Sequence, residues 1–133
     1  MNVKFLKTKL MTLIWCVEDW TSLFFVASFV KEFYLYKDLK LVKKITLEVI
    51  KNLLEEELVI AGDLLKNNIF SQWRISTDVI IEKTKYNWDN LGRELYMYEL
   101  VWFEITKKGE KEMEYLNKLP ELKETDPFYF DDK

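Results

Sequence analysis

Apolar residues recur at every third or fourth position along most of the chain, a spacing typical of amphipathic helices. The clearest case is the segment 38–55, where Asp38 can cap the first turn. Its apolar positions follow one another every four residues: Leu41, Ile45, Val49 and Leu53. The same spacing predicts a helix over residues 19–34, with Asp19 as its N-cap.

Two further helices are predicted in the second half of the chain. Ser76 or Thr77 can open a third helix that runs through Leu91, and Gly92 is placed to end it. The last helix ends at Pro120, which cannot continue it. Its apolar side is lined by Met113, Leu116 and Leu119.

Strands are predicted where the period changes to two. Residues 58–65, "LVIAGDLL", are a short β-favouring run that Gly62 breaks, which predicts a short strand and a turn. Residues 97–106 are the strongest strand candidate, because apolar residues occupy both of its faces. One face carries Val101, Phe103 and Ile105, and the other carries Leu100 and Trp102. Thr106 and Gly109 predict the turn that follows.

This succession of elements indicates the fold class. An apolar strand that leads through Thr-Lys-Lys-Gly-Glu into an amphipathic helix, within residues 98–115, is typical of the end of a winged-helix domain. We therefore expect an α+β fold: a mostly helical, winged-helix-like domain with a small β-sheet and wing, in which the third helix takes the recognition position. Residues 1–133 are expected to form one domain, divided into a helical arm (1–18), a core (19–119) and an acidic, aromatic tail (120–133).

The N-terminus has the composition of a targeting signal, but only in part. Three lysines in the first nine residues precede the apolar run 10–17. No small-residue cleavage site follows, and Glu18 and Asp19 interrupt the run before it reaches membrane-spanning length. We therefore expect a cytoplasmic protein without a membrane partner.

The apolar stripe of the N-terminal segment has two interpretations. It continues past the arm at intervals of three and four residues, through Leu6, Leu10, Leu13, Val17, Trp20, Phe24 and Ala27. The stripe can belong to a helix that packs on its own domain, which the general behaviour of such stripes favours. It can also form one continuous helix with a seam for a partner, and a homodimer would then follow.

Composition excludes several classes of chemistry. The chain has no histidine, which excludes Ser-His and Cys-His nucleophilic systems and histidine metal sites. Cys16 is the single cysteine and lies in an apolar run, where a buried, inert thiol is expected. The three glycines form no phosphate-binding loop. We expect no catalytic residues, no cofactor and no metal, and hence no enzyme.

Charge argues against nucleic acid as the partner. The formal net charge is −3, from 20 basic and 23 acidic side chains, which gives no general attraction to phosphate. In the third helix, residues 78–90, acids outnumber bases by one. A small basic cluster near the expected wing is diluted by four glutamates. Its members are Lys107, Lys108 and Lys111.

Three motifs give the chain a family resemblance. They are Gly-Asp-Leu at 62–64, Trp-x-x-Leu-Gly-Arg at 88–93, and an acidic residue before Leu-Val-Trp-Phe-x-x-Thr-x-x-Gly at 99–109. With these motifs the segment from about 50 to 112 resembles a family of small bacterial winged-helix-like proteins. Leu95 and Tyr98 stand where that family has Pro and Gly, so a different path is expected for the loop from 93 to 99.

Proteins of this kind are similar to the immunity proteins of bacterial contact-dependent growth inhibition systems. The resemblance implies a non-catalytic protein that binds and neutralises a cognate toxin domain. Nuclease-like toxins are often basic, and an acidic binder gains association rate and specificity from complementary charge. The predicted partner-binding residues are acidic, aromatic or next to such residues: Asp63, Asp89, Arg93, Glu94, Tyr96, Tyr98, Asp126, Phe128, Tyr129, Asp131 and Asp132.

Alternatives remain open at this stage. Arg93 and Asp63 can instead form an ion pair that fixes the loop after the third helix, and the tail can be disordered. For the whole protein, the alternative function is a winged-helix transcriptional regulator that binds DNA and dimerises through its N-terminal helix. A third hypothesis is a structural or adaptor module without a toxin.

Overall fold

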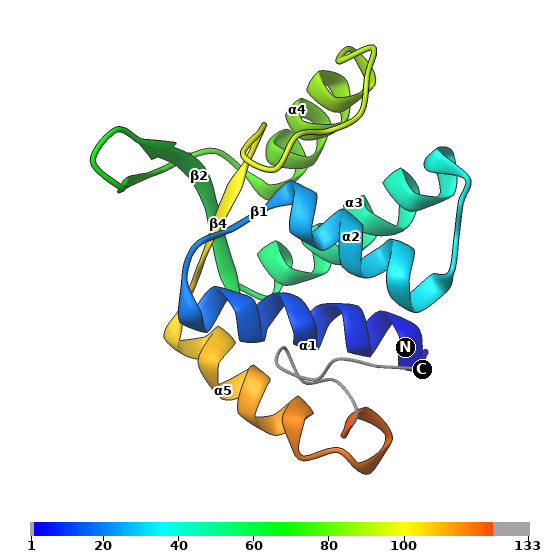
Figure 1. Cartoon of the computed structure of the whole chain (residues 1–133). Helices are drawn as coiled ribbons and strands as arrows, with labels where there is room; N and C mark the ends of the chain where they lie inside the picture. The colour runs from blue at the N-terminus through cyan, green and yellow to red at the C-terminus, as the bar shows by residue number, and fades with distance from the viewer. Residues whose placement is uncertain (1, 124–133) are drawn as a thin grey trace.

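The computed structural model describes residues 2–123 (Figure 1). Within this range the elements are α1 (Val3–Glu18), β1 (Thr21–Ser22), α2 (Leu23–Tyr34), α3 (Leu39–Glu55), β2 (Val59–Leu65), β3 (Ile69–Gln72), α4 (Thr77–Asp89), β4 (Trp102–Ile105), α5 (Lys107–Asn117) and the 3-10 turn η1 (Pro120–Leu122). The strands form one antiparallel sheet in the order β1-β4-β2-β3. The predicted α+β class is confirmed.

The helix that precedes β2 in the chain is α3 (Leu39–Glu55), whereas the helix predicted in the recognition position is the one at 76–91. Helices α2 and α3 are joined by residues 35–38, and β2 follows α3 closely. In a helix-turn-helix pair the second helix is the one that enters the major groove. In this chain the second helix of the adjacent pair α2–α3 is α3, and not the helix at 76–91. In the chain, β3 and α4 lie between the two paired strands β2 and β4.

Helix α1 lies inside the fold rather than standing off it as an arm. Figure 1 shows α1 between α5 and α2, and it also contacts β4 and η1. Its side chains Leu10 and Leu13 are fully buried. Leu122 of η1 is fully buried as well, so the first residues of the expected tail belong to the packed core. The apolar stripe of α1 is therefore a core stripe at Leu10 and Leu13, whereas Val17 at its end is 43% exposed.

A buried lysine ties three helical segments together. Lys9 of α1 is only 3% exposed. Its Nζ lies 3.4 Å from an Oε of Glu56, at the end of α3, and 3.2 Å from an Oε of Glu112 on α5. A buried ammonium without a partner costs several kcal/mol, so the packing of α1 at this point depends on the carboxylates beside Lys9. The lysines that resemble a targeting signal thus include one that is part of the core.

Residues 19–22 break the helix that the apolar stripe predicts. Helix α2 begins at Leu23, and residues 21–22 pair with residues 102–103 of β4 as a short strand. Asp19 is the C-cap of α1, not the N-cap of a helix over 19–34. The continuous N-terminal helix is wrong for the same reason: strand pairing with β4 requires an extended backbone at these two residues.

The predicted strand at 97–106 is shorter than its apolar pattern. Only Trp102–Ile105 forms a strand, because Leu100 has a φ of 72°, which an extended ladder cannot accommodate. The Thr106 hydroxyl accepts a hydrogen bond from the Gly109 amide at 3.0 Å, so these residues open α5 instead of forming a separate turn. Strand β3 (69–72) has little apolar alternation and was not predicted.

Gly62 is required by close packing within the sheet. It lies inside β2, opposite Gln72, and does not end the strand. A Cβ at this position would collide with the Ser71 carbonyl and with the Phe70 ring. The missing side chain therefore lets β3 and the Phe70 ring approach β2 directly.

We expect Lys9→Glu to lower the free energy of unfolding by about 3–5 kcal/mol, since it places a third carboxylate in a buried site. The matched control is Lys4→Glu, the same charge change at an exposed position of α1; it should change the stability by less than about 1 kcal/mol. Urea unfolding of the two variants measures the difference. Equal effects would contradict the central role of Lys9.

We expect Gly62→Ala to cost about 1–3 kcal/mol, because the added methyl group displaces the backbone of β3. Gly92 offers a control, since it has a φ of 68° and nothing within 4 Å of its Cβ position. Asparagine tolerates such a φ, so Gly92→Asn should stay within about 0.5 kcal/mol of the wild type. Thermal unfolding compares both variants, and a neutral Gly62→Ala would overturn the packing argument.

Candidate partner-binding surface

The loop between α4 and β4, residues 92–100, carries four of the predicted partner-binding residues: Arg93, Glu94, Tyr96 and Tyr98. The Arg93 guanidinium holds the loop closed. Its Nη1 and Nη2 donate to the two carboxylate oxygens of Glu99 at 2.8 and 2.6 Å. Nη1 also donates to the Glu94 carbonyl at 2.9 Å. A two-pronged pair of this kind fixes direction as well as distance.

A ring and a backbone amide complete this closure, which we call the Arg93 clamp (Arg93, Tyr96 and Glu99). The Tyr96 amide donates to Glu99 Oε1 at 2.6 Å, and the Arg93 guanidinium lies 3.8 Å from the centre of the Tyr96 ring. The hydrogen bonds from Arg93, and then the one from the Tyr96 amide, lower the pKa of Glu99 to about 2. The same pairing raises the pKa of Arg93.

The clamp presents three large side chains to solvent. Tyr96, Met97 and Tyr98 are 58%, 41% and 69% exposed. The Ser22 hydroxyl donates to the Met97 carbonyl at 2.5 Å, which ties the middle of the loop to β1. The Tyr98 ring stacks on Trp102, with centroids 5.6 Å apart and an angle of 10° between the planes. The segment 96–98 is therefore fixed at Tyr96 by the Arg93 clamp, at Met97 by Ser22 and at Tyr98 by Trp102.

The hydrogen-bond partner of Asp63 is Trp73, which lies outside the loop at 92–100. Its carboxylate accepts a hydrogen bond from the Trp73 indole at 2.9 Å, and Lys83 lies 3.9 Å from the centre of the same Trp73 ring. The Asp63–Arg93 ion pair, the alternative considered from the sequence, is wrong, because Arg93 pairs with Glu99. Asp63 instead helps to fix the segment that leads into α4.

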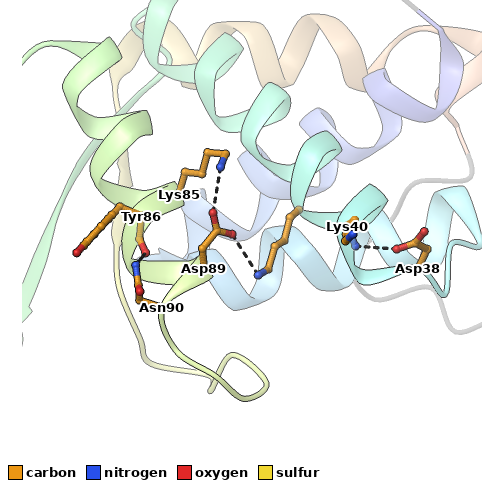
Figure 2. Close-up of polar contacts among 7 residues, drawn as sticks. Asp38, Lys40, Lys85, Tyr86, Asp89 and Asn90 are labelled. Atoms are coloured by element: carbon orange, nitrogen blue, oxygen red, sulfur yellow. Dashed lines mark hydrogen bonds and ion pairs between the residues drawn. The ribbon is translucent and has the colours of Figure 1, made fainter.

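Asp89 joins two helices. Its carboxylate lies 3.4 Å from the Nζ of Lys43 on α3 and 3.0 Å from the Nζ of Lys85 on α4 (Figure 2). The hydrogen bond from Lys85, followed by the one from Lys43, lowers the pKa of Asp89. Lys43 also lies 5.6 Å from the centre of the Trp88 ring. Asp89 therefore has a structural role in holding α4 on α3, while it stays partly exposed.

The remaining predicted contact residues have no structural account. Asp126, Phe128, Tyr129, Asp131 and Asp132 lie outside the described residues.

A groove next to the loop was not foreseen from the sequence. It has a volume of about 740 Å³ and lies between the end of α1, the start of α2, the β2-β3 hairpin and Tyr98. We call it the aromatic groove. Its lining residues are Trp15, Glu18, Asp19, Trp20, Phe25, Leu64, Leu65, Asn68, Tyr98 and Trp102. Tyr98 thus belongs both to the loop and to the groove.

Sheet register explains why these rings line a groove. Trp102 pairs with Gly62 of β2 and with Ser22 of β1, so its neighbours on that face of the sheet are small. Trp20, predicted as a core residue, is only partly buried, and its indole donates to a Glu104 carboxylate oxygen at 3.3 Å. The alternation of residues around Trp102 predicts which side of the strand its ring occupies. Its small neighbours, Ser22 and Gly62, come from segments that are distant in the sequence, so the alternation alone does not predict the groove.

The described residues contain few groups suited to other chemistry. Cys16 is buried, as expected, and burial raises its pKa to about 12. Among residues 2–123 there is no group of three or more His, Cys, Asp or Glu side chains that could hold a metal ion. No helix in that part of the chain has both the length and the apolar character needed to cross a bilayer.

Comparison of the chain with protein-family models, with curated proteins and with solved structures found no match. The family resemblance inferred from the three motifs therefore stays a prediction.

We expect the Arg93 clamp to open in acid. A lowered carboxylate pKa means that the stabilising contribution is complete above the pKa of the unfolded chain and is lost as the pH falls toward the folded value of about 2. The protection factor of the Tyr96 amide, which compares its exchange rate with that of an unstructured amide at the same pH, should therefore fall between about pH 4.5 and pH 2. Glu99→Gln should show fast exchange already at pH 6. Tyr96 exchange that is unchanged in this variant would contradict the role of the clamp.

Proposed function

We propose that the protein is an immunity protein, a non-catalytic inhibitor that binds a bacterial toxin domain in the cytoplasm and neutralises it by protein–protein contact. The observation that carries the proposal is the exposed Tyr96-Met97-Tyr98 segment on a loop that the Arg93 clamp already holds in place. Tyrosines are enriched among the residues that dominate binding energy at interfaces. Order before binding reduces the entropy lost on association.

Charge supports a basic partner. The net charge is −3, and no lysine or arginine is among the residues that line the aromatic groove beside the loop. Complementary charge speeds the encounter of two proteins and disfavours partners of the same sign. A nuclease-like toxin domain, basic because its substrate is an anion, fits this surface. The family resemblance points to the same function.

The alternative, a DNA-binding regulator, has less support. Helix α3 takes the recognition place in the order of elements, but α4 packs against it. Lys43, which a DNA-binding helix would use for phosphate, is paired with Asp89. The packing of α4 on α3 and the Lys43–Asp89 pair therefore favour a protein partner over DNA.

The direct test is co-expression with the toxin-like domain encoded beside the gene. Restored growth and a nanomolar dissociation constant by calorimetry would support the immunity function. If the protein neither restores growth nor binds the domain, its role as the inhibitor of that toxin-like domain is refuted. A salt-dependent DNA-binding titration would then decide for the regulator.

In the complex, we expect Tyr96→Ala and Tyr98→Ala each to weaken binding by at least about tenfold, the range of residues that dominate interfaces. Tyr115→Ala is the matched control, because Tyr115 is 60% exposed on α5. Calorimetry compares the three variants, and thermal unfolding checks that each is folded. A loss at Tyr115 as large as that at Tyr98 would place the interface elsewhere.

A further inference from the structure

The aromatic groove combines ring faces with carboxylates. One stacked pair, Trp15 and Phe25, comes from α1 and α2, with centroids 5.4 Å apart and planes at 29°. The second pair, Tyr98 and Trp102, comes from the loop and β4. Trp15 and Tyr98 are 37% and 69% exposed, so both pairs reach solvent. Aromatic faces carry negative potential and attract cations.

The two acidic residues of the groove, Glu18 and Asp19, lie at the C-terminus of α1, where negative charge does not stabilise a helix. Glu18 is the last residue of α1 and Asp19 is its C-cap, and the last turn of α1 contains no basic residue. The C-terminus of a helix already has a negative partial charge, so carboxylates there are unfavourable. Charges that reduce the stability of a helix are frequent at functional sites. The groove therefore has a concentrated negative potential beside its rings.

Within the same protein, a guanidinium already contacts an aromatic ring and a carboxylate at once. In the Arg93 clamp a guanidinium lies over a tyrosine ring while it pairs with a carboxylate. Arginine suits both contacts at once, because it is planar, weakly hydrated and able to donate to both oxygens of a carboxylate. The aromatic groove offers rings and carboxylates in the same combination, but its lining residues include no cation.

We propose that the aromatic groove receives an arginine side chain of the partner protein, which stacks on the exposed rings and pairs with Glu18 and Asp19. The inference rests on the proposed function for the protein nature of its occupant, and it adds the chemistry of one contact. A purely apolar segment would desolvate the Glu18 and Asp19 carboxylates without pairing their charge, which would be costly. A second copy of this acidic chain is a further occupant that the test distinguishes.

The test uses two blocked peptides, acetyl-Ser-Gly-Arg-Gly-Ser-amide and the same peptide with citrulline, an uncharged isostere, in place of arginine. The readout is the indole NMR signals of the full-length protein. Trp15, Trp20 and Trp102 line the groove, whereas Trp73 and Trp88 are internal controls outside it. The arginine peptide should shift the three groove signals only, and should bind at least about tenfold more tightly than the citrulline peptide.

A charge variant sharpens the test. Glu18→Gln/Asp19→Asn should weaken binding of the arginine peptide by about tenfold or more. The side-chain carbonyl of the asparagine introduced in this variant can still accept the hydrogen bond that the Asp19 carboxylate accepts from the Trp20 amide. Glu114→Gln/Glu121→Gln is the control, with the same loss of charge at exposed positions on α5 and η1. It should bind the peptide like the wild type.

Three results would overturn the proposal. They are equal binding of the two peptides, equal effects of the two charge variants, or groove signals that shift with protein concentration alone, which would identify a second copy as the occupant. The peptide measurement needs no toxin. Arginine binding without growth rescue would therefore refute the immunity function alone, and full toxin binding by Glu18→Gln/Asp19→Asn would refute the arginine contact alone.

Discussion

The burial of the Lys9 ammonium is the constraint on which the arrangement of the helices depends. It lies in the middle of α1, and its two carboxylate partners come from the end of α3 and from α5. Because an unpaired buried charge is far more costly than a paired one, the three segments must converge. Their convergence fixes the direction of α1 and therefore the place of its last turn, which brings Trp15 and Glu18 to the groove.

The second constraint is the position of β4 between β1 and β2. Residues 102–103 of β4 pair with residues 21–22 of β1, far away in the sequence, so the loop before β4 has to end beside β1. The bond from Ser22 to the Met97 carbonyl and the stack of Tyr98 on Trp102 both follow from this pairing. The Arg93 clamp then orders the exposed part of the loop locally. Tyr98 belongs to both the loop and the groove, which is why we propose a single protein partner for the two.

Local signals predicted the helices well and the loop poorly. Asp38 and Ser76 cap α3 and α4 as expected, because a cap depends on a side chain and amides two or three residues away. The sequence indicated Arg93, Tyr96 and Tyr98 as residues of one loop, as the structure has them, but the alternative ion pair of Arg93 with Asp63 is wrong because Arg93 pairs with Glu99. The groove was missed because Trp20 belongs to an apolar stripe with the spacing of core residues, and Trp15 lies in an apolar run.

The sequence by itself determined the α+β class, the caps of α3 and α4, the absence of histidine chemistry and the acidic net charge. These properties depend on composition or on residues within one turn of each other. Only the tertiary structure decided that α1 is central, that residues 21–22 form a strand, and that five rings and two carboxylates line one groove. Those features depend on contacts between distant segments, whose free energies no local pattern contains.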